Sequence, residues 1–333
     1  MSIPIAFILC TEGGALEQES LLMVESFRKY TGSFKDAPLY SFQVREKNDV
    51  SAATIAKLIE FGVTHQKVVL NTKYPDYPLA NKPLLCAYAE QAIDADILVF
   101  LDSDLVFFSE PKEFLLPSEY DIGIRPEHHK MIGSEGKSDP NDEYWMRLYH
   151  IAGVKDPEQF VTTTVDRKKI RAFWNSGVVA VRRKLGIFTA WQQTIEQLLV
   201  AGTAITTENW YYEQSALSAT ICAMNINVLQ FSRSYNYPIH SHNQLNETGR
   251  YHNFDDIVCI HDHFFRNRRE KYRERTWVKT LKQMQDFERQ SEKYQWLYTY
   301  LQQHNSPPNL AQACLETVLF LPLIRSLLPN RKL

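Results

Sequence analysis

Hydrophobic runs alternate with polar and amphipathic segments along the first half of this chain. The runs without internal alternation that predict strands are IPIAFILC (3–10), PLYSFQV (38–44), QKVVL (66–70) and ILVFL (97–101). Helical spacing of apolar residues follows the TEGG turn and recurs at about 51–61 and in NKPLLCAYAEQAI (81–93). Continuous apolar runs are typical of strands buried on both faces of a parallel sheet. Strands alternating with helices therefore predict βαβ units and an α/β fold.

The pattern is less regular after residue 104. Further strands are predicted at YDIGIRP (120–126), FWNSGVVAVRR (173–183), INVLQFS (226–232) and IVCIHDH (257–263), and helices at about 185–201 and 209–225. We expect the last two strands to complete the main sheet. Residues 127–165 are polar and rich in His, Asp and Gly, and they predict a long functional loop, such as a lid or an acceptor wall.

The composition shifts at Arg266, where a highly charged stretch begins. Trp277, Leu281, Met284, Phe287 and Trp296 lie near helical spacing in it, which predicts an amphipathic helix packed on the main domain. We therefore divide the chain into a catalytic domain, 1–265, and a C-terminal helical extension, 266–333. The final segment, LETVLFLPLIRSLLPNRKL, suits either a terminal helix on the core, which we favour, or a peripheral membrane contact.

Composition excludes several classes of protein. The 333 residues are 44% hydrophobic and 23% charged, as in an ordinary globular protein, and the net charge of −2 gives no reason to expect nucleic-acid binding. The five cysteines are scattered without a CxxC pair, which favours reduced thiols in a cytoplasmic protein. The apolar start continues into TEGG, so we interpret it as a core strand and not as a signal peptide.

Two carboxylates follow the most apolar run of the chain, in ILVFLDSDLVFF (97–108). Ionised carboxylates inside a core are costly unless they are paired or bind a cation, so we expect Asp102 and Asp104 where the strand leaves the core. Residues two apart share a face of a strand, so both acids project together and can hold Mn²⁺ or Mg²⁺. His261 and His263 in IHDH share a face in the same way, and either could supply a third ligand.

The apolar strand followed by DSD resembles the DxD motif of GT-A fold glycosyltransferases, and the resemblance covers roughly residues 3–265. Its companions are the N-terminal βαβ units, the helix directly before the motif, the NSGVVAV stretch and the late histidine-bearing strand. The resemblance implies a Rossmann-like mixed sheet flanked by helices. The NSG turn is similar to that of the retaining, glycogenin-like branch.

In such enzymes a divalent cation bridges the diphosphate of a nucleotide-sugar donor. The resemblance implies that Asp104 binds this cation directly, with Asp102 as its partner, and that a late histidine completes the ligands. We slightly prefer His261 over His263. The expected donor is a UDP-sugar, and the acceptor could be a glycan, a lipid or a protein.

Other donor contacts follow from position. The resemblance places the nucleotide base near Thr11 and Glu12, at the end of the first strand. Lys82 and Arg266 are candidates to contact the diphosphate. Asn175 and Gly177 in NSG would line the sugar, because an amide both donates and accepts hydrogen bonds and glycine allows close approach.

The pair Glu213 and Gln214 leaves the stereochemistry open, because the retaining branch carries Asp-Gln in the corresponding region. If the enzyme inverts, Glu213 or Glu208 is the candidate base that deprotonates the acceptor, whereas a retaining enzyme needs no such base. Two alternative functions remain. A haloacid dehalogenase-like phosphohydrolase also carries Asp-x-Asp after an apolar strand, and a non-catalytic sugar-binding relative could keep the fold.

Overall fold

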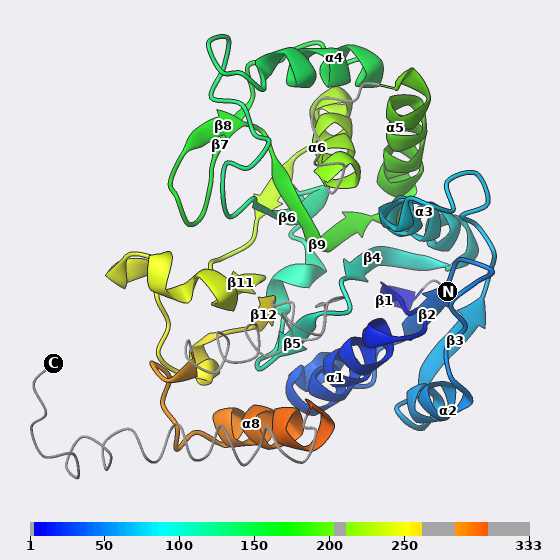
Figure 1. Cartoon of the computed structure of the whole chain (residues 1–333), viewed down its shortest axis with the longest axis vertical. Coiled ribbons are helices and arrows are strands. Elements are labelled where there is room, and N and C mark those ends of the chain that lie inside the picture. Colours follow the sequence, from blue (N-terminus) through cyan, green and yellow to red (C-terminus); the bar gives the residue numbers. More distant parts are fainter. Residues whose placement is uncertain (1–2, 203–210, 262–283, 306–333) are drawn as a thin grey trace, which may run out of the picture.

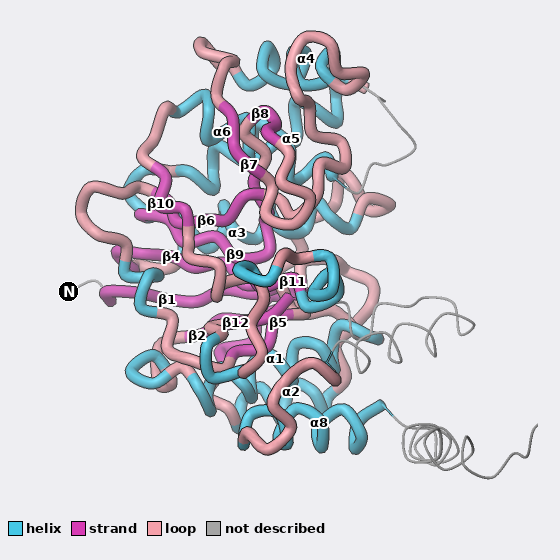
Figure 2. Tube along the Cα trace, turned by 90° about the vertical axis from the view of Figure 1, so that its left-hand side faces the viewer, coloured by secondary structure: helices cyan, strands magenta, loops and turns pink. Residues whose placement is uncertain are grey.

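A seven-stranded mixed sheet forms the centre of the molecule, with helices on both faces (Figures 1 and 2). The computed structural model describes residues 3–202, 211–261 and 284–305. The strands run in the order β10-β6-β9-β4-β1-β2-β3. They are β1 (Ile3–Cys10), β2 (Leu39–Gln43), β3 (Val63–Lys67), β4 (Ala95–Leu101), β6 (Ile122–Pro126), β9 (Trp174–Arg182) and β10 (Val228–Gln230). β1 to β4 are parallel, and β9 is antiparallel to both β4 and β6, so the expected mixed sheet is confirmed.

Each face of the sheet has its own hydrophobic core. In β1, Ala6 and Ile8 face the first core, while Phe7 and Leu9 face the second. All four side chains are fully buried, as continuous apolar runs of a sheet covered on both sides require. The helices of the first core are α3 (Asn81–Ala92), α4 (Asp142–Ala152), α5 (Ile187–Ala201) and α6 (Tyr212–Met224). Those of the second are α1 (Ala15–Tyr30) and α2 (Ala52–Glu60).

A second, three-stranded sheet lies beside the main one, in the order β11-β12-β5. Its strands are β5 (Leu105–Phe107), β11 (Tyr237–Pro238) and β12 (Cys259–His261). The prediction that the late histidine strand completes the main sheet is therefore wrong. β12 instead pairs antiparallel with β5, the strand that directly follows the two acids. Hydrophobic runs do not specify pairing partners, so the sequence could not show this second sheet.

The segment 127–165 is more ordered than the predicted loop. It contains α4, and β7 (Phe160–Thr162) forms a hairpin with β8 (Lys169–Arg171). Buried Arg171 of β8 donates from Nε to Asp142 Oδ1 (2.6 Å) at the start of α4, which joins the hairpin to the helix. The sequence did contain a signal for this helix, because helical spacing separates its buried residues Tyr144, Trp145, Leu148 and Tyr149.

The third strand of the main sheet begins earlier than the sequence indicates. β3 covers Val63–Lys67, whereas the apolar run predicts 66–70. As an edge strand it pairs only with β2, and its polar residues need no cover on either face. Val68 and Leu70 leave the strand and pack against the first core.

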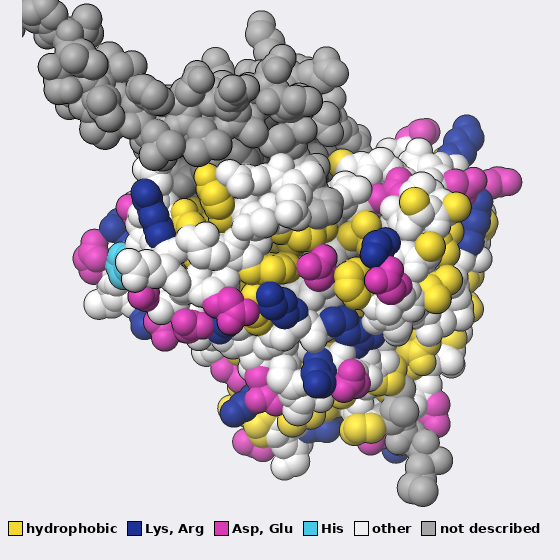
Figure 3. Space-filling view, turned by 90° about the horizontal axis from the view of Figure 1, so that it is seen from below, with side chains coloured by type: hydrophobic (Ala, Val, Ile, Leu, Met, Phe, Trp, Pro, Cys, Tyr) yellow, Lys and Arg dark blue, Asp and Glu magenta, His cyan; other side chains and the backbone are white. Residues whose placement is uncertain are grey.

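A helix from the charged C-terminal stretch packs beneath the sheet, next to α1 (Figure 1). This helix, α8 (Glu292–Asn305), and the residues just before it bury Met284, Phe287 and Leu297 against Leu22 of α1. The packing predicted for this stretch is thus observed in the described part, while Trp277, Leu281 and the final segment lie outside it. Positively and negatively charged side chains are interspersed on the face of the molecule that is seen from below (Figure 3). No helix among the described residues is long and apolar enough to span a membrane.

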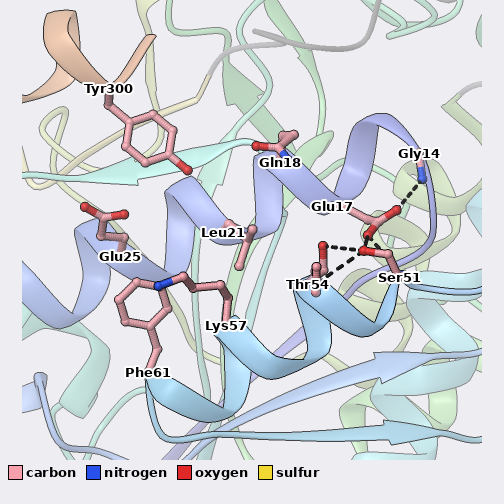
Figure 4. A pocket seen from close by; sticks show the side chains of 11 residues that line it. Gly14, Glu17, Gln18, Leu21, Glu25, Ser51, Thr54, Lys57, Phe61 and Tyr300 are labelled. Carbon is pink, nitrogen blue, oxygen red and sulfur yellow. Dashed lines mark hydrogen bonds between the residues drawn. The ribbon is translucent and has the colours of Figure 1, made fainter. Parts of the chain in front are cut away.

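The N-termini of α1 and α2 are tied together by one carboxylate (Figure 4). Glu17 accepts a hydrogen bond from the backbone N–H of Gly14 (3.0 Å) and another from that of Ser51 (3.0 Å). Ser51 in turn caps α2 by accepting from the N–H of Thr54 (3.2 Å). A pocket of about 500 Å³ lies between the two helices and Tyr300 of α8, and Glu17 lies in its wall with these bonds made.

Candidate active site

The two acids of the DSD motif lie where β4 leaves the core, as the sequence predicts. β4 ends at Leu101, and the turn that follows carries Asp102, Ser103 and Asp104 before β5 begins. The N–H of Asp102 donates to the carbonyl of Gly177 in β9 (2.8 Å), which fixes the start of the turn. Both acids are buried, so their charges need compensation by neighbours.

A histidine from the second sheet completes a cluster with these acids. β12 places His261 opposite Leu105 of β5, which brings its Nε2 to 3.1 Å from Asp104 Oδ1 and 3.8 Å from Asp102 Oδ2. One ligand atom from each of the three residues lies within 4.8 Å of the others. Burial works to lower the pKa of His261, but the two carboxylates outweigh it and hold that pKa above its usual value. His263 lies outside the described residues.

The three residues suit a divalent cation by their chemistry. Two carboxylates and one imidazole are a donor set that Mn²⁺ accepts, and the oxygens also suit Mg²⁺. All three side chains are buried and come from two separate strand ends, β4 and β12, so the fold itself assembles the cluster. We conclude that these residues fit a metal site of the kind that the DSD motif predicts.

A lysine bridges the acid cluster to α6. Lys82, in the first turn of α3, donates from Nζ to Asp102 Oδ2 (2.7 Å) and lies 3.5 Å from Glu213 Oε1. Ser176 donates to the same Glu213 oxygen (3.0 Å). Burial raises the pKa of Glu213 to about 7, against the lowering effect of Lys82. Glu213 is therefore poised to exchange a proton near neutral pH.

A second carboxylate organises the amide side chains of the site. Glu127 follows β6 and accepts hydrogen bonds from Asn175 Nδ2 (3.0 Å) and from Gln214 Nε2. Asn175 Oδ1 in turn accepts from Asn236 Nδ2 (2.8 Å) and from the N–H of Gly177 (2.9 Å). These bonds fix which end of each amide faces the cavity, so the Asn and Gln side chains are held in one orientation.

Gly177 is required for the close approach of β9 and β12. A Cβ at this position would lie 2.7 Å from His261 Cε1 and 3.0 Å from Asn175 Oδ1. Real Cβ atoms do not come so close to other heavy atoms. The glycine of NSG therefore makes room for the histidine of the cluster, a role that the sequence did not reveal.

One cavity of about 380 Å³ brings most of the predicted residues together. Those that line it are Lys82, Asp102, Asn175, Glu213, Gln214 and His261. Residues that line it but were missed in the sequence are Leu79, Glu127, His128, His129, Met131, Tyr211 and His240. A usable signal existed for three of them: PEHH directly follows β6, and ligands of open α/β sheets bind at the carboxyl ends of strands.

The residues predicted to hold the nucleotide base do not line this cavity. Thr11 is fully buried, and its hydroxyl pairs with those of Ser20 (3.1 Å) and Ser41 (2.8 Å). Glu12 accepts from Arg45 and from Asn81 Nδ2 (3.0 Å). Their role in binding the base therefore stays a prediction. Arg266 and Glu208, the other candidates from the sequence, lie outside the described residues.

Sequence comparison assigns the family. The profile of the Rhodobacterales glycosyltransferase domain matches residues 7–225, about two thirds of the chain. The chain belongs to this glycosyltransferase family. The match includes the DSD turn, Glu213 and the NSG sequence, which lies within β9 and is not the turn that the sequence predicts, whereas His261 lies beyond it. Among curated protein sequences none matches this glycosyltransferase significantly.

One of the similar solved structures supports the fold of this glycosyltransferase. The bifunctional glycosyltransferase WbbM in its apo form superposes with a TM-score of 0.51 at 11% identity, over 90% of this chain and 51% of WbbM. The chain thus spans about half the length of WbbM. Mouse xyloside xylosyltransferase 1 (TM-score 0.45, 13% identity, 78% of this chain and 98% of that one) is also similar. GlyE from Streptococcus pneumoniae is similar as well, with a TM-score of 0.46 and 13% identity over 83% of this chain and 60% of that one. The architecture is the mixed α/β fold of GT-A glycosyltransferases.

Proposed function

We propose that this glycosyltransferase is metal-dependent and moves a sugar from a nucleotide-diphosphate donor, with UDP-sugars the first candidates. The single observation that carries the proposal is the buried cluster of Asp102, Asp104 and His261 at the end of β4. Mn²⁺ or Mg²⁺ held there would stabilise the negative charge that the departing nucleoside diphosphate gains. The DSD turn then acts as a DxD motif.

The residues around the cluster have distinct roles in this proposal. Lys82 carries the positive charge nearest to Asp102 and Glu213, and it keeps the two buried acids from repelling each other. Asn175 and Gln214, both fixed by Glu127, orient the sugar through the second N–H of each amide nitrogen. Glu213 holds or releases a proton at its carboxylate, and it is the candidate base if the enzyme inverts.

Several finer features belong to the same proposal. Residues 1–265 would form the catalytic domain and 266–333 an extension. The NSG sequence supports the retaining, glycogenin-like branch, while the Glu-Gln pair on α6 departs from that branch and leaves the stereochemistry open. The described cysteines are free thiols, which supports a cytoplasmic location. The acceptor is a glycan or another hydroxyl compound.

The test measures metal binding and turnover separately. We expect wild-type protein to bind Mn²⁺ in calorimetry and to release nucleoside diphosphate from a nucleotide-sugar only when the metal is present. Asp104→Ala should lose both properties while its circular dichroism spectrum is unchanged. Release of phosphate from a phosphomonoester instead would support the phosphohydrolase alternative, and donor binding without turnover would support the non-catalytic one.

Asp76→Ala is the matched control, because it removes an exposed acid outside the cluster. It should bind Mn²⁺ and turn over donor like the wild type. Equal metal affinity in wild type and Asp104→Ala would overturn the proposed site.

A further inference from the structure

A second cavity, of about 950 Å³, lies beside the proposed active site and is lined by cationic and aromatic side chains. It is lined by the ends of β6 and β9, near the middle of Figure 1, and by the β7–β8 hairpin and the segment around β11, to their left. Its principal residues are Arg125, Arg167, Lys169, Arg233, Trp174 and Tyr237. No Asp or Glu is found among the described residues that line it.

The deepest cation of this cavity is not satisfied by the protein. Arg125 is 6% exposed, and its NH1 donates to the carbonyls of Ser232 (3.0 Å) and Tyr235 (2.9 Å). Its Nε is buried without a hydrogen-bond partner among the described residues. Burial lowers the pKa of Arg125 to about 10, which leaves it charged at neutral pH. A buried guanidinium with an unused donor is costly unless a ligand completes it.

An indole supplies a second unused donor. Trp174 is 7% exposed, and its Nε1 also lacks a partner among the described residues. Buried indole N–H groups normally find an acceptor.

The pocket between α1 and α2 (Figure 4) does not offer an unused polar group of this kind at Glu17. The carboxylate of Glu17 already accepts hydrogen bonds from Gly14 and Ser51.

The positively charged side chains at the rim of the cavity are not neutralised by carboxylates of described residues. Arg167, Lys169 and Arg233 are exposed and form no ion pair with a carboxylate of a described residue. Lys169 lies over the Phe160 ring (5.2 Å), and Arg233 over the Tyr251 ring (4.8 Å). Arg233 Nε also donates to the Tyr251 hydroxyl (3.0 Å), so its two terminal nitrogens and the Lys169 ammonium are the donors that remain for an anion.

The two cavities share a wall that is one residue thick. Trp174 lines the cationic cavity, and the next residue, Asn175, lines the proposed active site. Across the same wall, Thr164 Oγ1 lies 2.7 Å from His128 Nδ1, with Thr164 on the cationic side and His128 on the other. No described residue lines both cavities, so the cationic cavity adjoins the proposed active site and is separated from it by this wall.

We propose that this cavity binds the acidic part of an acceptor saccharide, whose carboxylate or phosphate is held by Arg125, Trp174 Nε1 and the cations at the rim, while another part of the same acceptor carries the reacting hydroxyl into the active site. This inference rests on the proposed transfer function, since it assigns the acceptor class for that reaction. Guanidinium groups pair with carboxylate and phosphate in the same manner, so the two anions are separate arms of the test.

The experiment measures saccharide binding to full-length protein by calorimetry, without donor or metal. Trigalacturonate represents the carboxylate and is compared with neutral maltotriose; glucose 6-phosphate represents the phosphate and is compared with glucose. We expect at least one acidic probe to bind about tenfold more tightly than its neutral counterpart. The arm that responds identifies the anion. Equal affinity of the acidic and neutral probes in both arms would overturn the proposal.

Variants locate the binding. The double variant K169Q/R233Q and the variant Trp174→Phe should each lower the affinity for the acidic probe by about fivefold or more. Lys184→Gln, which alters an exposed lysine outside the cavity, should leave this affinity unchanged. K169Q/R233Q alters only exposed side chains, so a loss of binding in this variant is not caused by misfolding. Unchanged binding in both cavity variants would overturn the assignment.

UDP binding in the presence of Mn²⁺ separates this inference from the proposed function. Loss of acidic-probe binding in the variants, with UDP binding retained, supports the acceptor site. If UDP and Mn²⁺ fail to bind to wild-type protein while the acidic probe does, the donor proposal fails and the anion site stands.

Discussion

At the scale of single residues, the site depends on buried carboxyl groups whose charge is set by their neighbours. Glu213 has a pKa raised to about 7 by burial, so it is protonated in acid and ionised above neutral pH. If its carboxylate takes the proton of the acceptor, turnover should fall as the pH decreases below about 7. Glu213→Gln should remove this acid limb and lower the rate by about 10²-fold or more.

The comparison for this prediction is Glu60→Gln, which alters an exposed carboxylate of α2. Its pH profile should match that of the wild type. An acid limb that persists in Glu213→Gln would show that another group titrates, as a retaining reaction without a base allows.

A second prediction at this scale concerns the space that Gly177 leaves for the His261 ring. In Gly177→Ala the new Cβ would lie 2.7 Å from the His261 ring, so the ring must move away from Asp104. Because the ring can rotate, we expect little loss of thermal stability but a fall of about 10-fold or more in Mn²⁺ affinity by calorimetry. His261→Ala should show a similar loss. Wild-type affinity in Gly177→Ala would argue against His261 as a ligand.

At the scale of elements, α4 and the β7–β8 hairpin are held together by one buried ion pair. Burial opposes ionisation of Asp142, but hydrogen bonds from Arg171 and Ser134 lower its pKa below the usual value. The pair therefore stabilises the fold above about pH 4, the ordinary Asp range, and this stabilisation is lost as the pH falls through the lower folded pKa.

Asp142→Asn tests this link. It leaves the Arg171 charge buried without its carboxylate, so we expect a loss of about 2–3 kcal/mol in the free energy of unfolding at pH 7. The difference from wild type should stay constant down to about pH 5 and shrink below about pH 4. Urea unfolding at several pH values measures it. Glu143→Gln, an exposed neighbour on α4, should change stability by less than about 1 kcal/mol, and an equal effect of both variants would contradict the prediction.

Elements also mark where sequence reasoning succeeded. The strand before the acids, the helix before that strand and the strand of the VVAV run follow from uniform burial and clear periodicity, and all three are observed, although the last already includes NSG, which was predicted as a turn. α4 was missed although its buried side chains follow the 3.6-residue pattern, because one short helix stands between long polar segments rich in His, Asp and Gly that are typical of a loop. Edge strand β3 was misplaced because pairing, and not hydrophobicity, decides where an edge strand begins.

At the scale of the whole molecule, α8 joins the main body through a third hydrophobic cluster shared with α1, β5 and β12. Leu297 is fully buried in it. Leu297→Ala should lower the free energy of unfolding by about 2–5 kcal/mol and still give one cooperative transition.

Chemical denaturation followed by circular dichroism and by tryptophan fluorescence tests this prediction, with the exposed Gln303→Ala as control. Coincident transitions for both probes are expected. A separate early transition in the wild type would show that α8 unfolds independently of the sheet.

The sequence by itself determined the α/β class, the βαβ start, and the position of two acids at the end of a buried strand, because hydrophobic periodicity and the cost of burying charge act locally along the chain. Only the tertiary structure decided that His261 reaches Asp104, that Gly177 must lack a side chain, and that Glu127 orients Asn175 and Gln214. Each of these contacts joins residues far apart in the sequence. They depend on strand pairing and sheet order, which no local pattern encodes.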